Sequence, residues 1–520
     1  PAEMLGRSPR ALSLSLYELL ITDNAWRIAR QKCGYFIPKG QPLMVSLAGQ
    51  PFIDTRLSFN SFLPKSLDPS ISKKLINHWV NKLRESPHLH DKIEFDVAIT
   101  AYSFDIDEKL NDYNFLSKNE KEIFKKSLFE ITIPLIKGVG KASIKNSLSK
   151  ISILDKLDYE KINNNFSNTF ELIEDIINYG TIPFSILARH GFIAKIILTS
   201  LVKKNILTQD NIDNFFSSIS TVASDLLIDM NKLKNNKITL SEFMQNYGHL
   251  RPGTYDILSK RYDQFEKFDL SNDDLKFQKD LKNNFQLSKL QLLKIDEIIK
   301  SNHIENYSSK KLFEYCKNAI KAREYAKFVF TKKVSRLIEN IANFGNEIGL
   351  SREEISHLPI STLIKYLSHS SSTDYVDELR KTSYINSLKH KISTAIRLPQ
   401  ILHDDSGVFI VPFQVSHPNF ITNKKVESAA IFIDTKDTDI ELNNKIILIE
   451  NADPGFDWIF SKRIQGLITK YGGVNSHMAI RCAEFGIPAA IGCGEQRFES
   501  LLNKDKIILD CGSGVISGAH

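Results

Sequence analysis

The strongest constraint on the fold is a glycine-rich turn followed by a short helix, within residues 471–494. Gly472 and Gly473 permit a sharp bend where larger residues would meet steric resistance. Ser476 is a favourable N-cap, and apolar residues follow it at helical spacing until a glycine and then a proline end the helix. We therefore expect His477 in the first turn of a helix, directly after the bend.

This position suits an anion. Unpaired backbone N–H groups and the positive end of the helix dipole gather there, as in many phosphate sites. A histidine in such a place can accept a phosphoryl group and pass it on. We predict His477 as the catalytic residue, and the predicted phosphate loop comprises Gly472, Gly473, Asn475 and Ser476. The alternative is a structural histidine in a glycine-rich turn.

Composition indicates an ordinary globular protein of about two to four domains. The 520 residues are 42% hydrophobic and 25% charged, and the formal net charge of +7 is diffuse. Neither a basic patch for nucleic acid nor an apolar run of the ~18 residues that span a membrane is evident. The five cysteines have no CxxC spacing, which favours a reducing, cytoplasmic setting.

Residues 1–107 are expected to form the β-containing part of an acceptor-substrate domain, with a helix over residues 13–30. Strands are predicted at residues 43–47, 51–60 and 94–105. Alternation along the second strand places Arg56 on a polar face, which either lines a pocket or meets water.

Residues 108–403 are expected to form the largely helical part of the same domain. Helical periodicity covers residues 119–136, 161–177, 184–203, 212–232, 287–301, 310–344 and 360–367. Residues 404–407 mark a hinge. Residues 408–520 then contain short apolar runs typical of a compact α/β domain, at 408–412, 430–433, 446–449 and 507–510.

A loop over residues 246–256 is the best candidate for substrate binding, because glycine and proline give it an irregular backbone. It presents His249, Arg251, Tyr255 and Asp256. Arg251 is a natural partner for a carboxylate or phosphate, as is Arg56. His249 and Asp256 are alternative bases. The competing interpretation is a structural loop in which Arg251 forms an internal ion pair.

Arg189, His190 and Gly191 interrupt an otherwise apolar helix and are a second candidate for substrate binding. Because glycine destabilises a helix interior, a close approach of backbone or ligand is expected at Gly191. Packing, with Arg189 paired to a carboxylate, is the alternative. His88 and His90 lack a further ligand nearby, so we predict no metal site.

The motif around His477 resembles the phosphohistidine swivelling domain of phosphoenolpyruvate synthases, pyruvate phosphate dikinases and rifampicin phosphotransferases. The resemblance covers residues 472–480, 484–489 and 492, and the upstream runs 446–455 and 464–469 are similar to the two strands of that family. It implies that His477 carries the phosphoryl group. Many relatives have threonine where this chain has Asn475, so any regulation through that hydroxyl is not expected.

Residues 1–6, 46–62, 90–105, 189–195 and 247–256 also resemble the L-glutamine kinase family of capsular phosphoramidate synthesis. The resemblance implies that ATP pyrophosphorylates the histidine, AMP and one phosphate leave, and the phosphoryl group passes to the glutamine amide nitrogen. ATP and Mg²⁺ would be bound by an ATP-grasp domain in cis or trans. No Walker-type loop is present, and because the chain starts without Met, we expect that domain to precede it.

The fold class expected is thus α+β multidomain: a mixed and largely helical substrate-binding region followed by a swivelling α/β domain. Two alternatives stay open. One is a phosphotransferase of the same family acting on a sugar, an antibiotic or water. The other is a phosphocarrier with no acceptor site of its own.

Overall fold

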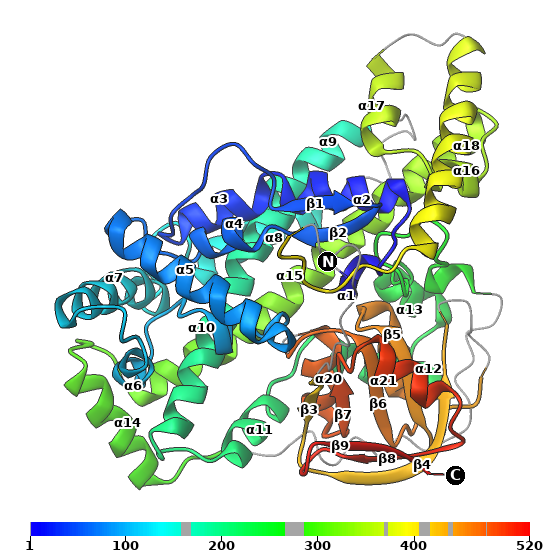
Figure 1. The fold of residues 1–520 in the computed structure, drawn as a ribbon. Helices are drawn as coiled ribbons and strands as arrows, with labels where there is room; N and C mark the ends of the chain where they lie inside the picture. The colour runs from blue at the N-terminus through cyan, green and yellow to red at the C-terminus, as the bar shows by residue number, and fades with distance from the viewer. Residues whose placement is uncertain are drawn as a thin grey trace.

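A computed structural model describes residues 2–157, 168–265, 285–368, 373–404, 417–434, 440–474 and 476–519. Two bodies are visible in Figure 1: a large helical body, residues 2–404, and a C-terminal body from residue 417 that contains the main sheet. The bodies contact each other, and that contact positions His477. The α+β fold class is confirmed.

The first part of the helical body combines helices with one β-hairpin. Its elements are α1 (Ala2–Leu5), α2 (Ala11–Tyr17), η1 (Glu18–Thr22), α3 (Ala25–Lys32), β1 (Met44–Leu47), β2 (Gln50–Ile53), α4 (Thr55–Asn60), α5 (Pro69–Glu85), η2 (Pro87–Leu89) and η3 (Ile93–Val97). β1 and β2 pair antiparallel through a turn at Ala48 and Gly49, both of which have positive φ.

Two strand predictions here are wrong. The strand expected over residues 51–60 ends at Ile53, because the side chain of Asp54 accepts a hydrogen bond from the Leu57 N–H and begins α4. Arg56 therefore lies on a helix. Residues 94–97 belong to π-helix η3, and residues 98–105 are irregular chain instead of a strand. The helix expected over residues 13–30 is present but interrupted near Asp23.

The remainder of the helical body is a set of packed helices. They are α6 (Ile106–Asn111), α7 (Lys118–Ile136), α8 (Ile144–Lys156), α9 (Asn168–Asp175), η4 (Ile176–Thr181), α10 (Ile182–Lys203), α11 (Gln209–Ser217), α12 (Val222–Lys234), α13 (Leu240–Tyr247), η5 (Tyr262–Gln264), α14 (Lys289–Ser301), α15 (Ser309–Glu347), α16 (Arg352–Ser356), α17 (Ile360–Ser368) and α18 (Thr373–Ala395). The helix predicted over residues 212–232 is wrong in one respect, since it is split into α11 and α12. Of the helix predicted over residues 161–177, residues 161–167 lie outside the described parts.

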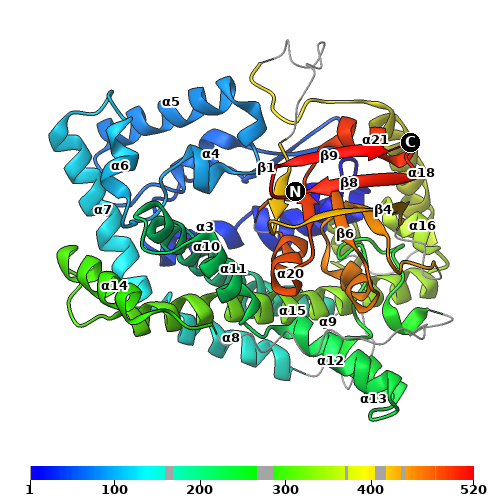
Figure 2. The ribbon, with the colours of Figure 1, turned by 90° about the horizontal axis from the view of Figure 1, so that it is seen from below.

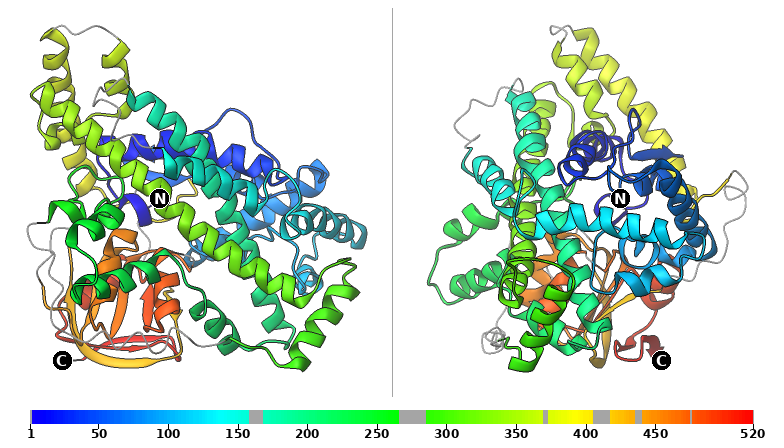
Figure 3. Two further views of the ribbon diagram at one scale, coloured as in Figure 1. Left: turned by 180° about the vertical axis from the view of Figure 1, so that it is seen from behind. Right: turned by 90° about the vertical axis from the view of Figure 1, so that its left-hand side faces the viewer.

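α15 organises this body. It is 39 residues long and crosses the whole molecule diagonally, as the rear view in Figure 3 shows. Apolar residues of α15 pack against α10 and against α8. The two hydrophobic cores of the helical body meet along α15. Beside the second of those cores, α15 turns a different face to the C-terminal body, with Glu324, Lys327, Phe328 and Thr331 on it.

The apolar segment Thr169–Lys203, which includes α10, is long and apolar enough by composition to cross a membrane. However, 61% of its apolar window is buried inside the protein. It packs as a core helix against α15, α8 and α3.

The C-terminal body is built on a seven-stranded sheet with the order β3-β7-β6-β5-β4-β8-β9. Its elements are β3 (Asn419–Ile421), β4 (Lys425–Phe432), β5 (Ile446–Asn451), η7 (Pro454–Ser461), β6 (Gly466–Tyr471), α20 (His477–Phe485), β7 (Ala489–Ile491), α21 (Glu495–Leu502), β8 (Lys506–Asp510) and β9 (Val515–Ala519). The strands β4 to β7 run parallel, and the outer strands β3, β8 and β9 pair antiparallel.

The parallel strands explain the position of His477. Segments that follow the carboxyl ends of parallel strands meet at the same edge of the sheet. Here η7 follows β5 and the glycine turn follows β6, and that edge faces the helical body, as the view in Figure 2 shows for α20. The strands predicted at 430–433, 446–449 and 507–510 are confirmed. The run 408–412 and the hinge residues 405–407 lie outside the described residues.

Candidate active site

The turn before His477 has the predicted form. Gly472 has φ +141°, and a Cβ on it would lie 3.0 Å from side chains of both Ala452 and Ile491, so only glycine fits between the neighbouring strands. Ser476 caps α20 by accepting a hydrogen bond from the Ala479 N–H at 3.2 Å. His477 is the first residue of the helix. Asn475 lies outside the described residues.

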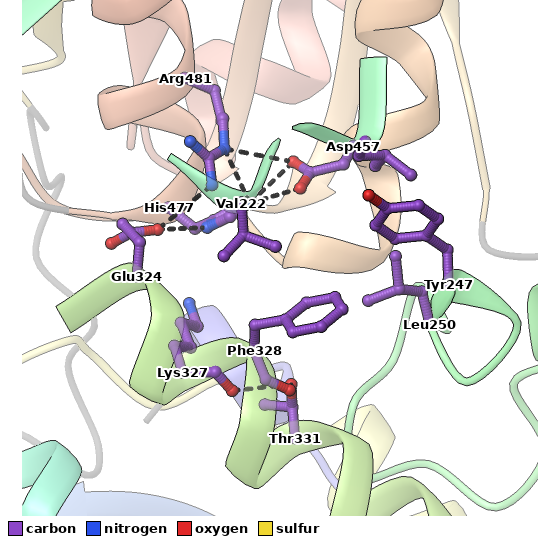
Figure 4. A pocket seen from close by; sticks show the side chains of 11 residues that line it. Val222, Tyr247, Leu250, Glu324, Lys327, Phe328, Thr331, Asp457, His477 and Arg481 are labelled. Carbon is purple, nitrogen blue, oxygen red and sulfur yellow. Dashed lines mark hydrogen bonds and ion pairs between the residues drawn. The ribbon is translucent and has the colours of Figure 1, made fainter. Parts of the chain in front are cut away.

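His477 is held at both ring nitrogens by carboxylates. Nδ1 lies 3.0 Å from Oε2 of Glu324, on α15, and Nε2 lies 2.7 and 2.8 Å from the two oxygens of Asp457, on η7 (Figure 4). The residue is only 4% exposed. Each ring nitrogen thus lies within hydrogen-bond distance of a carboxylate oxygen, and Nε2 also lies beside the Nε donor of Arg481. His477 is therefore buried among charges and not in packed hydrocarbon.

Arg481 lies one turn after His477 on α20 and places a positive charge beside the ring. Its Nε is 3.3 Å from Nε2 of His477, and its Nη2 is 3.4 Å from Glu324. Its Nη1 donates to Glu484 at 2.6 Å and also to Thr221 at the start of α12. Burial disfavours the charge of Arg481, but the neighbouring carboxylates Glu484, Asp457 and Glu324 exceed that effect and raise its pKa.

Glu324 is an ionised carboxylate in a buried place. Burial opposes ionisation, yet the charge of Arg323, followed by the hydrogen bond from His477 and the charge of Arg481, holds its pKa far below the ordinary value. Arg323 donates to its Oε1 at 2.9 Å. The two anions at the ring thus differ in origin. Asp457 belongs to the same body as His477, whereas Glu324 belongs to the helical body.

A small cavity of about 20 Å³ opens at this charged cluster, which is enough for a water molecule. Lys327, Phe328 and Thr331 of α15 line it together with Tyr247 and Leu250 (Figure 4). Lys327 adds a second cation close to the ring, and Phe328 and Leu250 form an apolar wall. The cavity thus places a cation and an apolar surface beside the ring of His477.

The loop over residues 246–256, predicted as a substrate loop, contacts the C-terminal body directly. The hydroxyl of Thr254 donates to the Asp453 carboxylate at 3.0 Å, and the Tyr262 hydroxyl donates to the Gly455 carbonyl at 2.9 Å. Gly455 packs so closely that a Cβ on it would overlap the backbone of Arg251. We call this contact surface, together with the Glu324–His477 contact, the seam.

The predicted ligands in that loop have internal partners. Arg251 forms a buried ion pair with Glu339 at 2.7 Å, the alternative considered from the sequence. Asp256 accepts from the Leu258 N–H at 3.0 Å. Tyr255 is fully buried and packs edge-on against Tyr17. None of these three lines the cavity at His477.

His249 does not line that cavity, although its neighbour Leu250 does. Its ring packs edge-on against Phe328, with centroids 4.8 Å apart. Burial, and then the positive charges of Lys332, Arg261 and Arg251, hold its pKa well below the ordinary value. It is therefore a neutral imidazole behind the cavity wall.

Three further predicted ligands lie away from His477. Arg189 is buried in an ion pair with Glu94 and donates to Thr100 at 2.8 Å. His190 is enclosed, with Nε2 2.8 Å from the Ala142 carbonyl, and burial lowers its pKa to about 4. Arg56 is on the surface and donates to Asn77 at 3.1 Å. A substrate role for them stays a prediction that these contacts do not support.

Sequence reasoning missed Glu324, Asp457, Arg481 and Lys327. Two of these residues could have been predicted from the sequence. Asp457 follows a predicted strand, and Arg481 lies four residues after His477 on the same helix face. Glu324 and Lys327 had no such signal. They sit in the middle of a long helix with many charged residues, and only tertiary packing selects them.

Comparison with known proteins agrees with this geometry. Residues 441–514 match the family model of the PEP-utilising enzyme, mobile domain. Residues 441–514, which include His477, are therefore similar to the mobile domain of PEP-utilising enzymes.

Among curated proteins, the chain is similar to rifampicin phosphotransferase of Bacillus cereus, with 22% identity over 300 residues, which is 52% of this chain and 33% of that protein. It is also similar to phosphoenolpyruvate synthases. That of Aquifex aeolicus is 30% identical over 86 residues, 16% of this chain and 10% of the relative. That of Neisseria meningitidis serogroup B is 33% identical over 69 residues, 13% of this chain and 8% of the relative. The chain thus spans a third or less of the length of these relatives.

Proposed function

We propose that this chain is the acceptor-binding and phosphocarrier part of a dikinase-like phosphotransferase, in which His477 carries the phosphoryl group. The observation that carries the proposal is the seam. The histidine of a mobile domain meets, in a buried place, a carboxylate and a cation contributed by a separate helical body. Phosphoryl transfer depends mainly on such positioning and charge stabilisation.

The contacts of the ring suggest which nitrogen is used. Glu324 accepts a hydrogen bond from Nδ1, which fixes the tautomer and leaves Nε2 for the phosphoryl group. Arg481 lies beside Nε2 and balances the negative charge of a phosphoryl group there. Asp457 contacts the same nitrogen and is placed to receive the proton of the acceptor.

The transfer step then balances as follows. The bond between Nε2 and phosphorus breaks while the acceptor atom forms its bond to phosphorus and loses one proton. That proton passes by way of Asp457 to Nε2. The distances of 2.7 and 2.8 Å between Nε2 and the two Asp457 oxygens fit the protonated Nε2 of the phosphate-free state after transfer.

The acceptor proposed is L-glutamine, phosphorylated on its amide nitrogen for capsular phosphoramidate synthesis. The likeness of several segments to L-glutamine kinases supports it. ATP and Mg²⁺ would be bound by an ATP-grasp domain in cis or trans, which would pyrophosphorylate His477 when the C-terminal body reaches it. We propose that the whole enzyme works in the cytoplasm.

A second acceptor class has its own support. The similarity to rifampicin phosphotransferase covers about half of the chain and not only the mobile domain. The apolar wall formed by Phe328 and Leu250 also suits the hydrocarbon part of an antibiotic. Transfer to an antibiotic hydroxyl is therefore the second candidate.

The deciding experiment supplies the chain with an ATP-grasp partner, ATP and Mg²⁺, and follows products by phosphorus NMR. A P–N signal that requires L-glutamine supports the first acceptor, and a phosphate ester of rifampicin supports the second. A protein that forms phosphohistidine but transfers to neither would overturn both. Replacing His477 with Asn removes the carrier, so it should abolish phosphohistidine and all net transfer. Full turnover of that variant would reject the covalent route.

A further inference from the structure

A second and much larger cavity lies between the two bodies, on the face of α20 that carries Ile480 and Ala483. Its volume is about 360 Å³, within the range of small-molecule sites. Side chains of α10, α11 and α15 form its walls in the helical body. The C-terminal body closes it with α20, with β3 and the turn that follows, and with Val474 of the glycine turn. The cavity is therefore complete only while the two bodies are in contact.

Lys195 of α10 contributes a primary amine to the wall of this cavity. Its Nζ donates a hydrogen bond to the Val474 carbonyl at 3.2 Å and lies 5.3 Å from the ring centroid of Phe95. Among the residues that the structure describes, no carboxylate lies within ion-pair distance of this amine. It is thus held by an uncharged acceptor and not by a counter-ion.

The charged form of Lys195 is disfavoured at this place. Burial is the main cause, and the charge of Arg323 adds to it, so that the pKa of the ammonium group falls to about 7. Asp213 of α11 and Asp96 of η3 act in the opposite direction without cancelling the shift. At neutral pH a large share of the molecules therefore has an uncharged amine here, and an uncharged lysine amine is a nucleophile.

A proton donor stands in the same cavity. Asp213 lines it from α11, where the side chain of Gln209 donates to its carboxylate at 2.9 Å. Burial raises the pKa of Asp213, although the hydrogen bond from Gln209 opposes the shift. Asp213 can therefore act as a general acid at a higher pH than an exposed aspartate does.

The rest of the cavity favours an uncharged ligand. Its apolar surface comes from Phe192, Ile212, Phe216, Ile320 and Ile480. Arg323 also lines it, but this guanidinium group is paired with Glu324 at 2.9 Å and offers no spare charge to a ligand. The close approach expected at Gly191 is present here, and the neighbour is a side chain, since a Cβ on Gly191 would lie 3.1 Å from Cδ of Arg323.

We propose that Lys195 is a covalent binding site for a small aliphatic aldehyde, which it holds as an imine inside this cavity. Nζ adds to the carbonyl carbon, and one of its protons passes to the carbonyl oxygen. Asp213 then gives its proton to the resulting hydroxyl group, which leaves as water while the C=N bond forms. The product is a protonated imine balanced by the Asp213 carboxylate, with the hydrocarbon chain of the aldehyde on the apolar wall. The reaction uses neither His477 nor a phosphoryl group.

Reductive trapping on the 520-residue chain tests the proposal. Butanal and cyanoborohydride at pH 7 convert each imine into a stable butyl-lysine, which peptide mass spectrometry locates. Lys195 should be labelled at least tenfold faster than Lys203, an exposed lysine on the same helix. Its labelling rate should saturate with butanal concentration, because the cavity binds the aldehyde before the bond forms. The advantage over Lys203 should shrink toward pH 10, where ordinary lysines also lose their protons.

Two variants separate the acid role of Asp213 from its charge. Removing a negative charge near Lys195 lowers the pKa of the amine further, so electrostatics alone predicts faster labelling in Asp213→Asn. Loss of the general acid predicts slower labelling, and we expect a decrease of at least tenfold. Asp210→Asn, an exposed change on the same helix, is the matched control and should leave the rate unchanged.

A third variant checks the position of the label. Lys195→Arg keeps a cation that can donate to Val474, and it should remove the fast label while labelling elsewhere stays the same. Equal rates at Lys195 and Lys203, or a rate at Lys195 that grows linearly with butanal concentration, would overturn the proposal. Labelling in Asp213→Asn that is as fast as in the unmodified chain, or faster, would also overturn it.

Discussion

At the scale of single residues, the site divides its two carboxylates between two bodies. Asp457 belongs to the same body as His477, whereas Glu324 contacts His477 from the helical body, across the seam. A reaction in which the carrier is charged at one place and discharged at another would use these groups at different times. Substitutions can therefore separate the two half-reactions.

Glu324→Gln should leave the charging of His477 by an ATP-grasp partner intact and slow the transfer to the acceptor. The amide keeps the size of the side chain but removes the charge that faces Nδ1, so we expect a loss of about 10²-fold in kcat for transfer. Rapid-quench measurement of phosphohistidine decay after addition of the acceptor gives this rate. Glu347→Gln, an exposed change on the same helix, is the control. Equal decay rates in the two variants would rule out the role of Glu324.

Asp457→Asn should impair both half-reactions. This carboxylate contacts Nε2 from within the same body. Under the proposed function, it therefore stays beside the ring in both half-reactions. We expect slower formation and slower decay of phosphohistidine, each by roughly 10²-fold, the usual magnitude for a positioned proton acceptor. Acid-labile phosphate on the protein, followed in both directions, measures this. A defect confined to one direction would contradict the assignment.

At the scale of elements, the seam depends on a glycine. Gly455 begins the turn after β5 and lies against the backbone of Arg251 and Pro252. Backbone atoms cannot rotate away as a side chain can, so an added methyl group cannot be accommodated without separating the two bodies.

Gly455→Ala should therefore abolish docking while the C-terminal body stays folded. We expect transfer to the acceptor to fall by more than tenfold, the radius of gyration from small-angle scattering to rise, and circular dichroism to stay unchanged. Gly512→Ala, in the same body, serves as the comparison, because its added methyl group would only lie near the Asn423 carbonyl at 3.2 Å. Unchanged scattering and turnover for Gly455→Ala would show that the contact between the two bodies tolerates the added methyl group.

Elements set by local chemistry were predictable from the sequence, and elements set by partners were not. The helix after His477 follows from its Ser476 cap and its glycine stop, both local signals. The strand predicted over residues 51–60 is wrong because the Asp54 side chain accepts a hydrogen bond from a backbone N–H and caps a helix. The alternation of polar and apolar residues gives no sign of such a cap. The polar loop at Arg251 looked like a ligand site because its partners, Glu339 and Asp453, are distant in sequence.

At the scale of the whole molecule, the two bodies meet through buried charge, which makes their contact sensitive to pH. Asp453 is 1% exposed at the seam, and burial raises its pKa to about 6. Hydrogen bonds from Gly455 and Thr254 and the charge of Lys327 oppose the shift without cancelling it. An aspartate exposed by separation of the bodies returns to its ordinary value of 3.8.

The sign of the effect follows from linkage. Asp453 binds its proton more tightly in the docked state, so docking is strongest below pH 4, where it is protonated in both states. Docking weakens as the pH rises from 4 through 6 and then levels off, because the carboxylate is ionised in both states. The shift of about two pKa units corresponds to a change of on the order of 100-fold in the docking equilibrium, or roughly 3 kcal/mol.

Small-angle scattering across pH 4.5–7.5 should therefore detect a rising population of separated bodies. Asp453→Asn carries no titratable proton and keeps the acceptor for Thr254, so it should flatten the profile and hold the docked population high at neutral pH. Under the proposed function, transfer uses the docked state and charging uses the separated one, so the same variant should slow recharging of His477 by an ATP-grasp partner. A pH profile in Asp453→Asn that matches the unmodified chain would assign the sensitivity to another group at the seam.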